Sequence, residues 1–274
     1  LRDIISSGAF SCVRLTRIFR QALESDIIKN AHLINEGREI ALDNKSRDFL
    51  CVKRKNAPDI LGVMVLLIRD KLPGYLGVRP ADIQVLTPMQ RGVVGAANLN
   101  LALQEALNPP EHDVFMRGRG RVTMPKECLR RGGYAYRADD KVMQVRNNYD
   151  KEVFNGDIGI VESVNETDRT LTVNFDGRSV DYDVTELDEL VHAYATTIHK
   201  AQGSEYPAVI IPLVSGPKML MNRNILYTAV TRARKCVCIV GRSEAVYGMI
   251  DNVREAERFS GLKDRIGEVK GHVL

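Results

Sequence analysis

The chain has 274 residues, 44% hydrophobic and 27% charged, with a formal net charge of +4. This is the composition of a soluble globular protein, and its longest apolar run, near residues 61–68, is too short to span a bilayer. With no signal-peptide pattern at the start of the sequence, we expect a cytoplasmic protein of two domains, or one large domain with an insertion, whose five cysteines are buried thiols.

Helical and extended patterns alternate over the first 110 residues. Ile27, Ala31 and Ile34 recur at helical spacing ahead of Gly37, which predicts a helix ending there. Strands are predicted at 49–52 and 82–87, a buried helix at 60–69 closed by Pro73 and Gly74, and a second helix at 92–107. This alternation is typical of a parallel α/β sheet.

The pattern changes between about residues 120 and 190. Short β-rich runs are separated by turns, and Asp176-Gly177 is typical of a two-residue hairpin. The runs lie at 141–146, 158–164, 170–175 and 178–184. We predict a small antiparallel barrel inserted into the α/β domain.

The α/β alternation returns near Ala193. It predicts a strand at 208–213, a helix through 225–233 and a strand at 237–240, followed by a charged, helical segment over 251–274 at the edge.

Charge is distributed unevenly along the chain. Residues 1–120 carry a net +4 and residues 191–274 a net +5, so these two segments together could face a polyanion. Residues 121–190 carry −5 and are not expected to bind phosphates by charge. Base stacking in this segment would rely on Tyr134, Tyr136 and Phe154.

Arg232 ends the predicted helix just before the next strand. Ligands in open α/β sheets lie outside the carboxyl ends of strands and at adjoining helix termini, where an arginine can bind a phosphate. The alternative is a solvated arginine, or one that complements the helix dipole. Arg20, at helical spacing from Arg14 and Arg17, allows the same two interpretations.

Two strand ends combine hydroxyl and basic side chains. Thr197 is followed by His199 and Lys200, and Thr87-Pro88 by Arg91-Gly92. Such junctions suit oligonucleotide phosphates, although Thr197 could simply cap a helix. His199 has no Ser, Cys or metal-ligand constellation near it in sequence, so no metal site is expected.

No G-x-x-x-x-G-K-[ST] phosphate loop occurs in the 274 residues. We therefore expect part of a nucleotide site rather than a complete one.

Together these segments resemble a superfamily 1B helicase of the RecD/TraA type, the group that includes the exodeoxyribonuclease V alpha subunit. The likeness covers nearly the whole chain. The matching stretches are RLTRIFRQA (14–22), VLTPMQRG (85–92) with Leu99-Asn100 and 107–109, FNGDIG (154–159), residues 194–207 and LYTAVTRAR (226–234).

The resemblance implies a RecA-like second motor domain formed by residues 1–118 and 192–250, an SH3-like barrel over 119–191 and a helical tail over 251–274. It implies that Arg20 and Arg232 reach the γ-phosphate of ATP. The residues implied on the nucleotide side are Gln21, Gly203 and Glu205, and those along the single-stranded DNA path are Thr87, Pro88, Arg91, Thr197 and His199.

The resemblance also implies ATP and Mg²⁺ as cofactors, bound mainly by an N-terminal motor domain of the same protein, and 5′-to-3′ movement on single-stranded DNA. The phosphate-loop lysine and the Mg²⁺-binding acidic motif of that domain do not occur in this sequence. We therefore expect them upstream, and expect the chain alone to be inactive. The alternatives are a non-catalytic single-stranded DNA-binding or interaction module, and the helicase subunit of an exonuclease V complex acting in repair or recombination.

Overall fold

The computed structural model of the chain describes residues 2–13, 25–116, 120–253 and 260–272. Arg20 and Gln21, two of the residues implied to bind nucleotide, lie outside the described residues, as do Arg14 and Arg17.

A five-stranded sheet, with every neighbouring pair parallel, forms the centre of the fold in the order β1-β14-β13-β2-β12. Its strands are β1 (Phe49–Lys53), β2 (Ile83–Thr87), β12 (Ala195–Thr197), β13 (Tyr206–Leu213) and β14 (Ala233–Gly241). The predicted parallel α/β sheet is confirmed.

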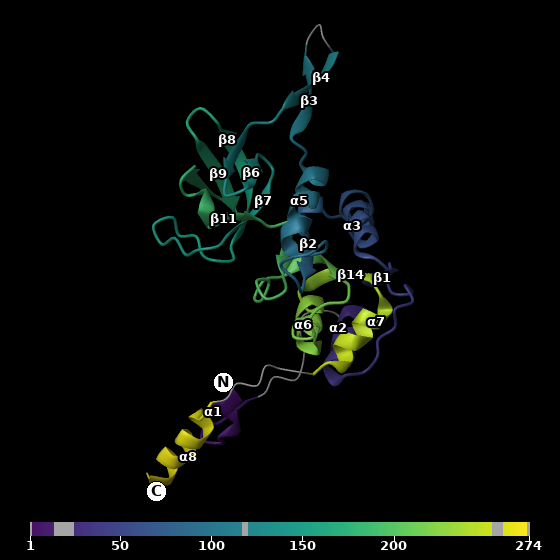
Figure 1. Ribbon diagram of the computed structural model, residues 1–274, viewed down its shortest axis with the longest axis vertical. Coiled ribbons are helices and arrows are strands. Elements are labelled where there is room, and N and C mark those ends of the chain that lie inside the picture. The colour runs from purple at the N-terminus through teal and green to yellow at the C-terminus, as the bar shows by residue number, and fades with distance from the viewer. Residues whose placement is uncertain (1, 14–24, 117–119, 254–259, 273–274) are drawn as a thin grey trace.

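Helices cover both faces of this sheet (Figure 1). One face packs on α2 (Asp26–Glu36), α6 (Arg223–Val230) and α7 (Ser243–Asp251), and the other on α3 (Ala57–Leu66) and α5 (Ala96–Leu107). Side chains alternate along a strand, so Val237 and Ile239 of β14 join the first core while Cys236 and Cys238 join the second. Burial on both faces explains why β13 and β14 are almost continuously apolar.

Helix ends follow the sequence signals in part. Gly37 closes α2 with a φ of 76°, as predicted. The helix that begins with α3 does not stop at Pro73, because Pro73 lies in the first turn of α4 (Leu72–Leu76), where its missing N–H costs nothing. A π-helical stretch, η1 (Leu67–Lys71), joins the two helices, and η2 (Pro80–Asp82) leads into β2.

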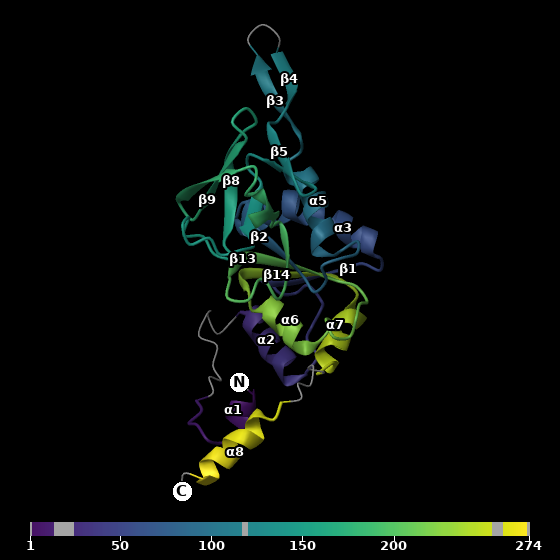
Figure 2. The ribbon, with the colours of Figure 1, turned by 60° about the vertical axis from the view of Figure 1, so that its left-hand side comes forward.

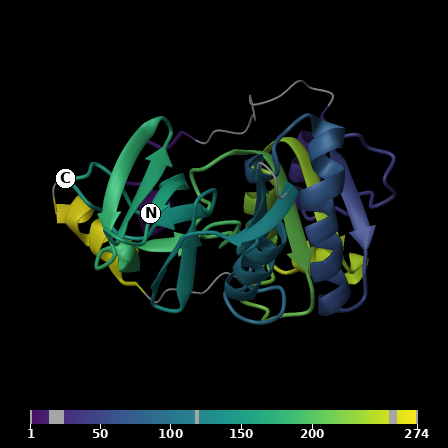
Figure 3. The same ribbon diagram turned by 90° about the horizontal axis from the view of Figure 1, so that it is seen from above.

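The segment between α5 and β12 contains a second, antiparallel sheet in the order β10-β9-β8-β7-β11. Its strands are β7 (Lys141–Gln144), β8 (Ile158–Asn165), β9 (Thr170–Phe175), β10 (Arg178–Asp183) and β11 (Leu190–His192), with η3 (Leu187–Glu189) before the last. A hairpin of β5 (Cys128–Arg131) and β6 (Tyr134–Arg137) packs on the same core. Figure 3 shows this inserted sheet beside the parallel one.

The inserted sheet is open. The predicted antiparallel insertion is confirmed, but among the described residues its hydrogen-bonded ladder runs from β10 to β11 without closing into a barrel. The predicted hairpin turn is confirmed, because Asp176 and Gly177 both have positive φ, of 51° and 91°.

Three features were not predicted. A hairpin of β3 (Glu111–Met116) and β4 (Gly120–Pro125) projects away from both sheets (Figure 2). The helix α8 (Leu262–His272) lies against α1 (Arg2–Ser6), away from the parallel sheet rather than at its edge (Figure 1). Cys12 is exposed and Cys128 half-buried, whereas the other three cysteines are buried as expected.

Every helix in the described part of the chain is too short or too polar to cross a membrane.

Candidate functional site

The two predicted polar junctions lie side by side. Thr87 and Thr197 are paired in register at the carboxyl ends of β2 and β12. The N–H of Ile198 donates to the carbonyl oxygen of Thr87 at 3.0 Å, which continues the pairing one residue beyond the strands. The two junctions therefore form one site at the carboxyl edge of the sheet.

Thr87 shapes the turn that follows it. Its fully buried hydroxyl donates to the carbonyl of Val94 at 2.8 Å and accepts from the N–H of Met89 at 3.3 Å. Pro88 is also buried, and the exposed polar side chains at these two junctions are those of Gln90, Arg91, His199 and Lys200.

A tight turn of residues 88–95 connects β2 to α5. Two N–H groups at the start of α5 are already bonded, Ala96 to the Met89 carbonyl at 2.9 Å and Ala97 to that of Gln90 at 3.1 Å. These donors are therefore not directed at an external phosphate.

No helix follows Thr197, so the helix-capping alternative is wrong. The N–H groups of Lys200 and Ala201 both donate to the Thr197 carbonyl, at 3.0 and 3.2 Å, in a run of turns. Residues 198–205 then carry the chain from the carboxyl end of β12 to the amino end of β13. We refer to this segment as the 198–205 connection.

The nucleotide-side residues within the described chain meet at the opposite, amino edge of the sheet. The guanidinium of Arg232 donates from Nη1 to the Ser204 carbonyl at 3.1 Å, and the Tyr206 N–H donates to the Arg232 carbonyl at 2.9 Å. Arg232 therefore lies beside the segment that contains Gly203 and Glu205. Arg234 donates from Nε to the Glu205 carboxylate at 3.0 Å.

The expected position of Arg232 at a carboxyl edge is wrong. The helix α6 returns the chain from the carboxyl end of β13 to the amino end of β14, so its last turn lies at the amino edge. Arg232 also donates from Nε to the Thr228 carbonyl at 3.2 Å. It thus bonds the end of its own helix, as the helix-terminus alternative predicted.

A cleft of about 780 Å³ separates this amino edge from the inserted sheet. Its walls include Asp82, Glu205 and Tyr206 on one side, and Lys141 and Gly159 on the other. Burial lowers the pKa of the Lys141 ammonium to about 8, because a charge is poorly solvated there. Lys141 is the residue at this cleft that the sequence analysis did not single out.

Comparisons with known proteins agree with this arrangement. The ATP-dependent RecD-like DNA helicase SH3 domain matches residues 99–175, and the UvrD-like helicase C-terminal domain matches residues 192–240. Over 254 residues, 93% of its length, the chain is 35% identical to the ATP-dependent RecD2 DNA helicase of Deinococcus radiodurans. These matches identify the chain as RecD-like, with a RecD-like helicase SH3 domain and a UvrD-like helicase C-terminal domain.

This RecD-like chain spans 32% of the length of that relative. It is also 33% identical, over 46% of its own length and 22% of the relative's, to the RecBCD enzyme subunit RecD of Mycolicibacterium smegmatis. The fold is similar to that of the Pif1 helicase from Bacteroides, solved in complex with ADP-AlF3 and ssDNA. The TM-score is 0.50 at 18% identity, over 94% of this chain and 57% of that one.

The inserted segment from β5 to β11 lies largely within the SH3 match, and we call it the SH3 domain. Of the aromatic residues named for base stacking, Tyr136 is wholly buried and donates to the Leu190 carbonyl at 2.6 Å, so the prediction is wrong for Tyr136. Tyr134 is half-buried against His192. Phe154 is exposed and packs edge-on against Tyr149, which is 74% exposed and which the sequence analysis missed.

Within the described ranges, no three His, Cys, Asp or Glu side chains are grouped to bind a metal ion. The amino edge supplies a guanidinium and a carboxylate already paired with Arg234. This donor set suits the outer oxygens of a nucleotide phosphate better than it suits Mg²⁺, which prefers carboxylate and phosphate oxygens together.

Proposed function

We propose that this chain is the second motor domain of an ATP-dependent DNA helicase and that the whole protein couples ATP hydrolysis to 5′-to-3′ movement on single-stranded DNA. In this proposal, residues 1–118 and 192–250 form the motor domain, 119–191 the SH3 insertion and 251–274 a tail. The protein would act in the cytoplasm, in DNA repair or recombination.

The observation that carries the proposal is the eight-residue connection between Thr197 and Tyr206. It begins beside Thr87 at the carboxyl edge and ends beside Arg232 at the amino edge. A displacement of the nucleotide edge therefore has a short covalent route to the proposed DNA edge.

At the nucleotide edge, Arg232 supplies a permanent positive charge. To reach a γ-phosphate it exchanges its bond to the Ser204 carbonyl for a charge-assisted bond to phosphate oxygen. An arginine acting in this way contributes about 10³ to 10⁵ in rate, or roughly 4–7 kcal/mol of barrier. Arg20 and Gln21, outside the described residues, would complete this edge with Gly203 and Glu205.

ATP and Mg²⁺ would be bound mainly by an N-terminal motor domain that provides the phosphate loop. When bound, Mg²⁺ neutralises charge on the phosphates. The contribution of this chain is the guanidinium and the closing surface around it.

At the DNA edge, the exposed Arg91 and His199 would contact phosphates of a single strand, with Thr87, Pro88 and Thr197 holding the backbone around them. The exposed Phe154 of the SH3 domain offers a surface for base stacking.

A second candidate function is that of a helicase subunit in an exonuclease complex. The similarity to RecBCD subunit RecD over 46% of the chain favours it. Stable co-purification with nuclease subunits would support this candidate, whereas a protein active and monomeric by itself would support the first.

The test is ATP hydrolysis by the full-length protein with and without single-stranded DNA. We expect DNA to stimulate hydrolysis and Arg232→Ala to abolish the stimulation. The control is Lys235→Ala, which removes an exposed cation three residues away. Equal stimulation in wild type and Arg232→Ala, or no hydrolysis in wild type, contradicts the proposal and leaves the non-catalytic binding module.

A further inference from the structure

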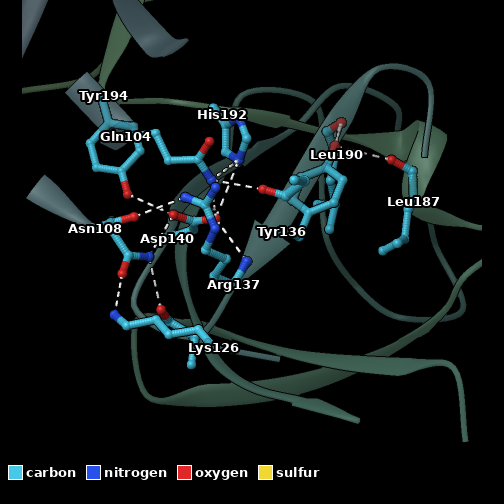
Figure 4. Close-up of polar contacts among 12 residues, drawn as sticks. Gln104, Asn108, Lys126, Tyr136, Arg137, Asp140, Leu187, Leu190, His192 and Tyr194 are labelled. Atoms are coloured by element: carbon cyan, nitrogen blue, oxygen red, sulfur yellow. Dashed lines mark hydrogen bonds and ion pairs between the residues drawn. The ribbon is translucent and has the colours of Figure 1, made fainter. Parts of the chain in front are cut away.

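A buried carboxylate joins the SH3 domain to the motor domain. Asp140, with no exposed surface, accepts hydrogen bonds at Oδ2 from Gln104 Nε2 at 2.6 Å and at Oδ1 from Asn108 Nδ2 at 2.7 Å. These two donors belong to α5 and its C-cap, on the motor side. Figure 4 shows them converging on the carboxylate.

The remaining partners of Asp140 come from the segment that enters and leaves the SH3 domain. The Arg137 N–H donates to Oδ2 at 2.8 Å, the Tyr194 hydroxyl donates to Oδ1 at 2.8 Å, and His192 Nε2 lies 3.3 Å from Oδ2. Burial raises the pKa of the Asp140 carboxyl, but hydrogen bonds and the imidazole of His192 outweigh it and the pKa lies below its ordinary value. Asp140 is thus held as a carboxylate between two domains.

Lys141, the next residue, connects the SH3 domain to a second part of the motor domain. Lys141 is 5% exposed, and its ammonium donates to the Ala81 carbonyl, just before β2, at 2.8 Å. It also lies 5.8 Å from the ring centroid of Tyr206, the residue that follows the 198–205 connection. Asp140 immediately precedes β7 and Lys141 is its first residue, and the two contact different parts of the motor domain, α5 for Asp140 and Ala81 with Tyr206 for Lys141.

We propose that Asp140 and Lys141 are positioning residues, Asp140 holding the SH3 domain on α5 and Lys141 coupling it to the 198–205 connection through Tyr206, so that nucleotide-driven movement of this connection also moves the SH3 domain. This inference rests on the proposed function, because it assigns a role in the motor cycle to that same connection. Arg232 and Tyr206 are joined by a backbone hydrogen bond. Movement of the arginine is therefore transmitted first to Tyr206 and then to Lys141.

The test compares substitutions across the joint with matched substitutions beside it, in the full-length protein. Lys141→Met and Gln104→Met remove one connection each without changing side-chain length greatly. The control Lys151→Met breaks an ion pair with Glu186 that lies wholly within the SH3 domain, and Glu105→Met replaces an exposed neighbour of Gln104 on α5.

The readouts are the DNA-stimulated ATPase rate and the number of base pairs unwound per ATP. We expect the joint variants to keep the ATPase rate within about twofold but to unwind about threefold fewer base pairs per ATP, in line with coupling changes seen for residues between sites. Both controls should leave the two readouts unchanged. Unaltered base pairs per ATP in Lys141→Met and Gln104→Met would overturn the inference.

Hydrogen exchange provides a measurement that does not depend on unwinding. Binding of a non-hydrolysable ATP analogue should change amide exchange at residues 156–160, which line the cleft opposite Glu205, in wild type but not in Lys141→Met. An equal response in both proteins, or none in a wild type that hydrolyses ATP, overturns the coupling. A wild type without ATP hydrolysis instead overturns the proposed function on which the coupling rests.

Discussion

A Cβ atom added to Gly95 would lie 2.4 Å from the carbonyl carbon of Arg91, so the turn between β2 and α5 closes only around a glycine. We expect Gly95→Ala to lower the free energy of unfolding by about 1–3 kcal/mol, as overpacking usually does. Because the turn carries Arg91, affinity for single-stranded DNA should fall as well.

The matched control is Gly62→Ala on α3. A Cβ there meets no atom within 4 Å, and alanine is favoured over glycine in a helix by about 0.5–1 kcal/mol. Urea unfolding should therefore show a lower free energy of unfolding for Gly95→Ala and a higher one for Gly62→Ala. A change of the same sign in both variants would contradict this account of the turn.

Arg91→Gln should weaken binding of single-stranded DNA and make it less sensitive to salt. Loss of one phosphate contact reduces the slope of log affinity against log salt by about 0.7 for a single strand. The control is Arg69→Gln, an exposed arginine on η1 paired with Asp70. Fluorescence anisotropy titrations at several salt concentrations would measure both, and identical slopes for the two variants would exclude Arg91 from the DNA path.

Asp140→Asn should destabilise the protein by about 3–5 kcal/mol, the usual cost of breaking a buried charged network. Gln104 and the Arg137 N–H donate to Oδ2, and Asn108 and Tyr194 donate to Oδ1, so an asparagine NH2 group at either position faces another donor. The control Asp150→Asn changes an exposed carboxylate in the same domain.

The stability lost in Asp140→Asn should depend on pH, because the pKa of Asp140 is lowered in the folded protein. The carboxylate stabilises the fold fully above its ordinary pKa of 3.8, and the benefit disappears as pH falls through the lower pKa of the folded state. The stability gap between wild type and Asp140→Asn should therefore narrow below about pH 4. A gap that stays constant down to pH 2 would be inconsistent with an ionised Asp140.

Lys141→Met should raise stability at pH 7, because it removes the cost of burying an ammonium group. The pKa of Lys141 falls from 10.5 to about 8 on folding. Between these two pH values the unfolded state binds more protons, so wild-type stability rises with pH there by up to about 3 kcal/mol.

Lys141→Met lacks this rise in stability with pH. Its stability advantage over wild type should therefore shrink as pH increases from 8 to 10.5. Urea unfolding at pH 7, 9 and 10.5 would measure it. Because other groups titrate equally in both proteins, only the difference is informative, and a constant difference would contradict a buried, charged lysine.

The parallel sheet was predictable from sequence because its strands are buried on both faces. Apolar runs such as 208–213 are typical of a parallel strand that is covered by helices on both faces. The hairpin of β3 and β4 was not predictable in the same way. Glu111, His112 and Asp113 are all exposed, so buried and exposed residues do not alternate there as they do along a half-buried strand.

The sequence indicated which residues to examine for a site, but not at which edge of the parallel sheet each of them lies. Hydroxyls at two strand ends marked Thr87 and Thr197 as two similar junctions, and the strand register shows that they lie side by side. Local sequence did not show that α6 ends at the amino edge, because this depends on the direction in which the helix crosses the sheet. Asp140 and Lys141 follow a polar turn and resemble solvated charges. Asp140 is buried against α5, more than 30 residues earlier, and Lys141 against Ala81 and Tyr206.

The SH3 domain leaves and rejoins the motor domain at almost one point. Asn108, where the chain departs, and His192, where it returns, both contact the carboxylate of Asp140. The strands on either side, β2 and β12, are already neighbours in the parallel sheet. The domain is therefore inserted as a cassette, and a change in its length would leave the order of the parallel strands unchanged.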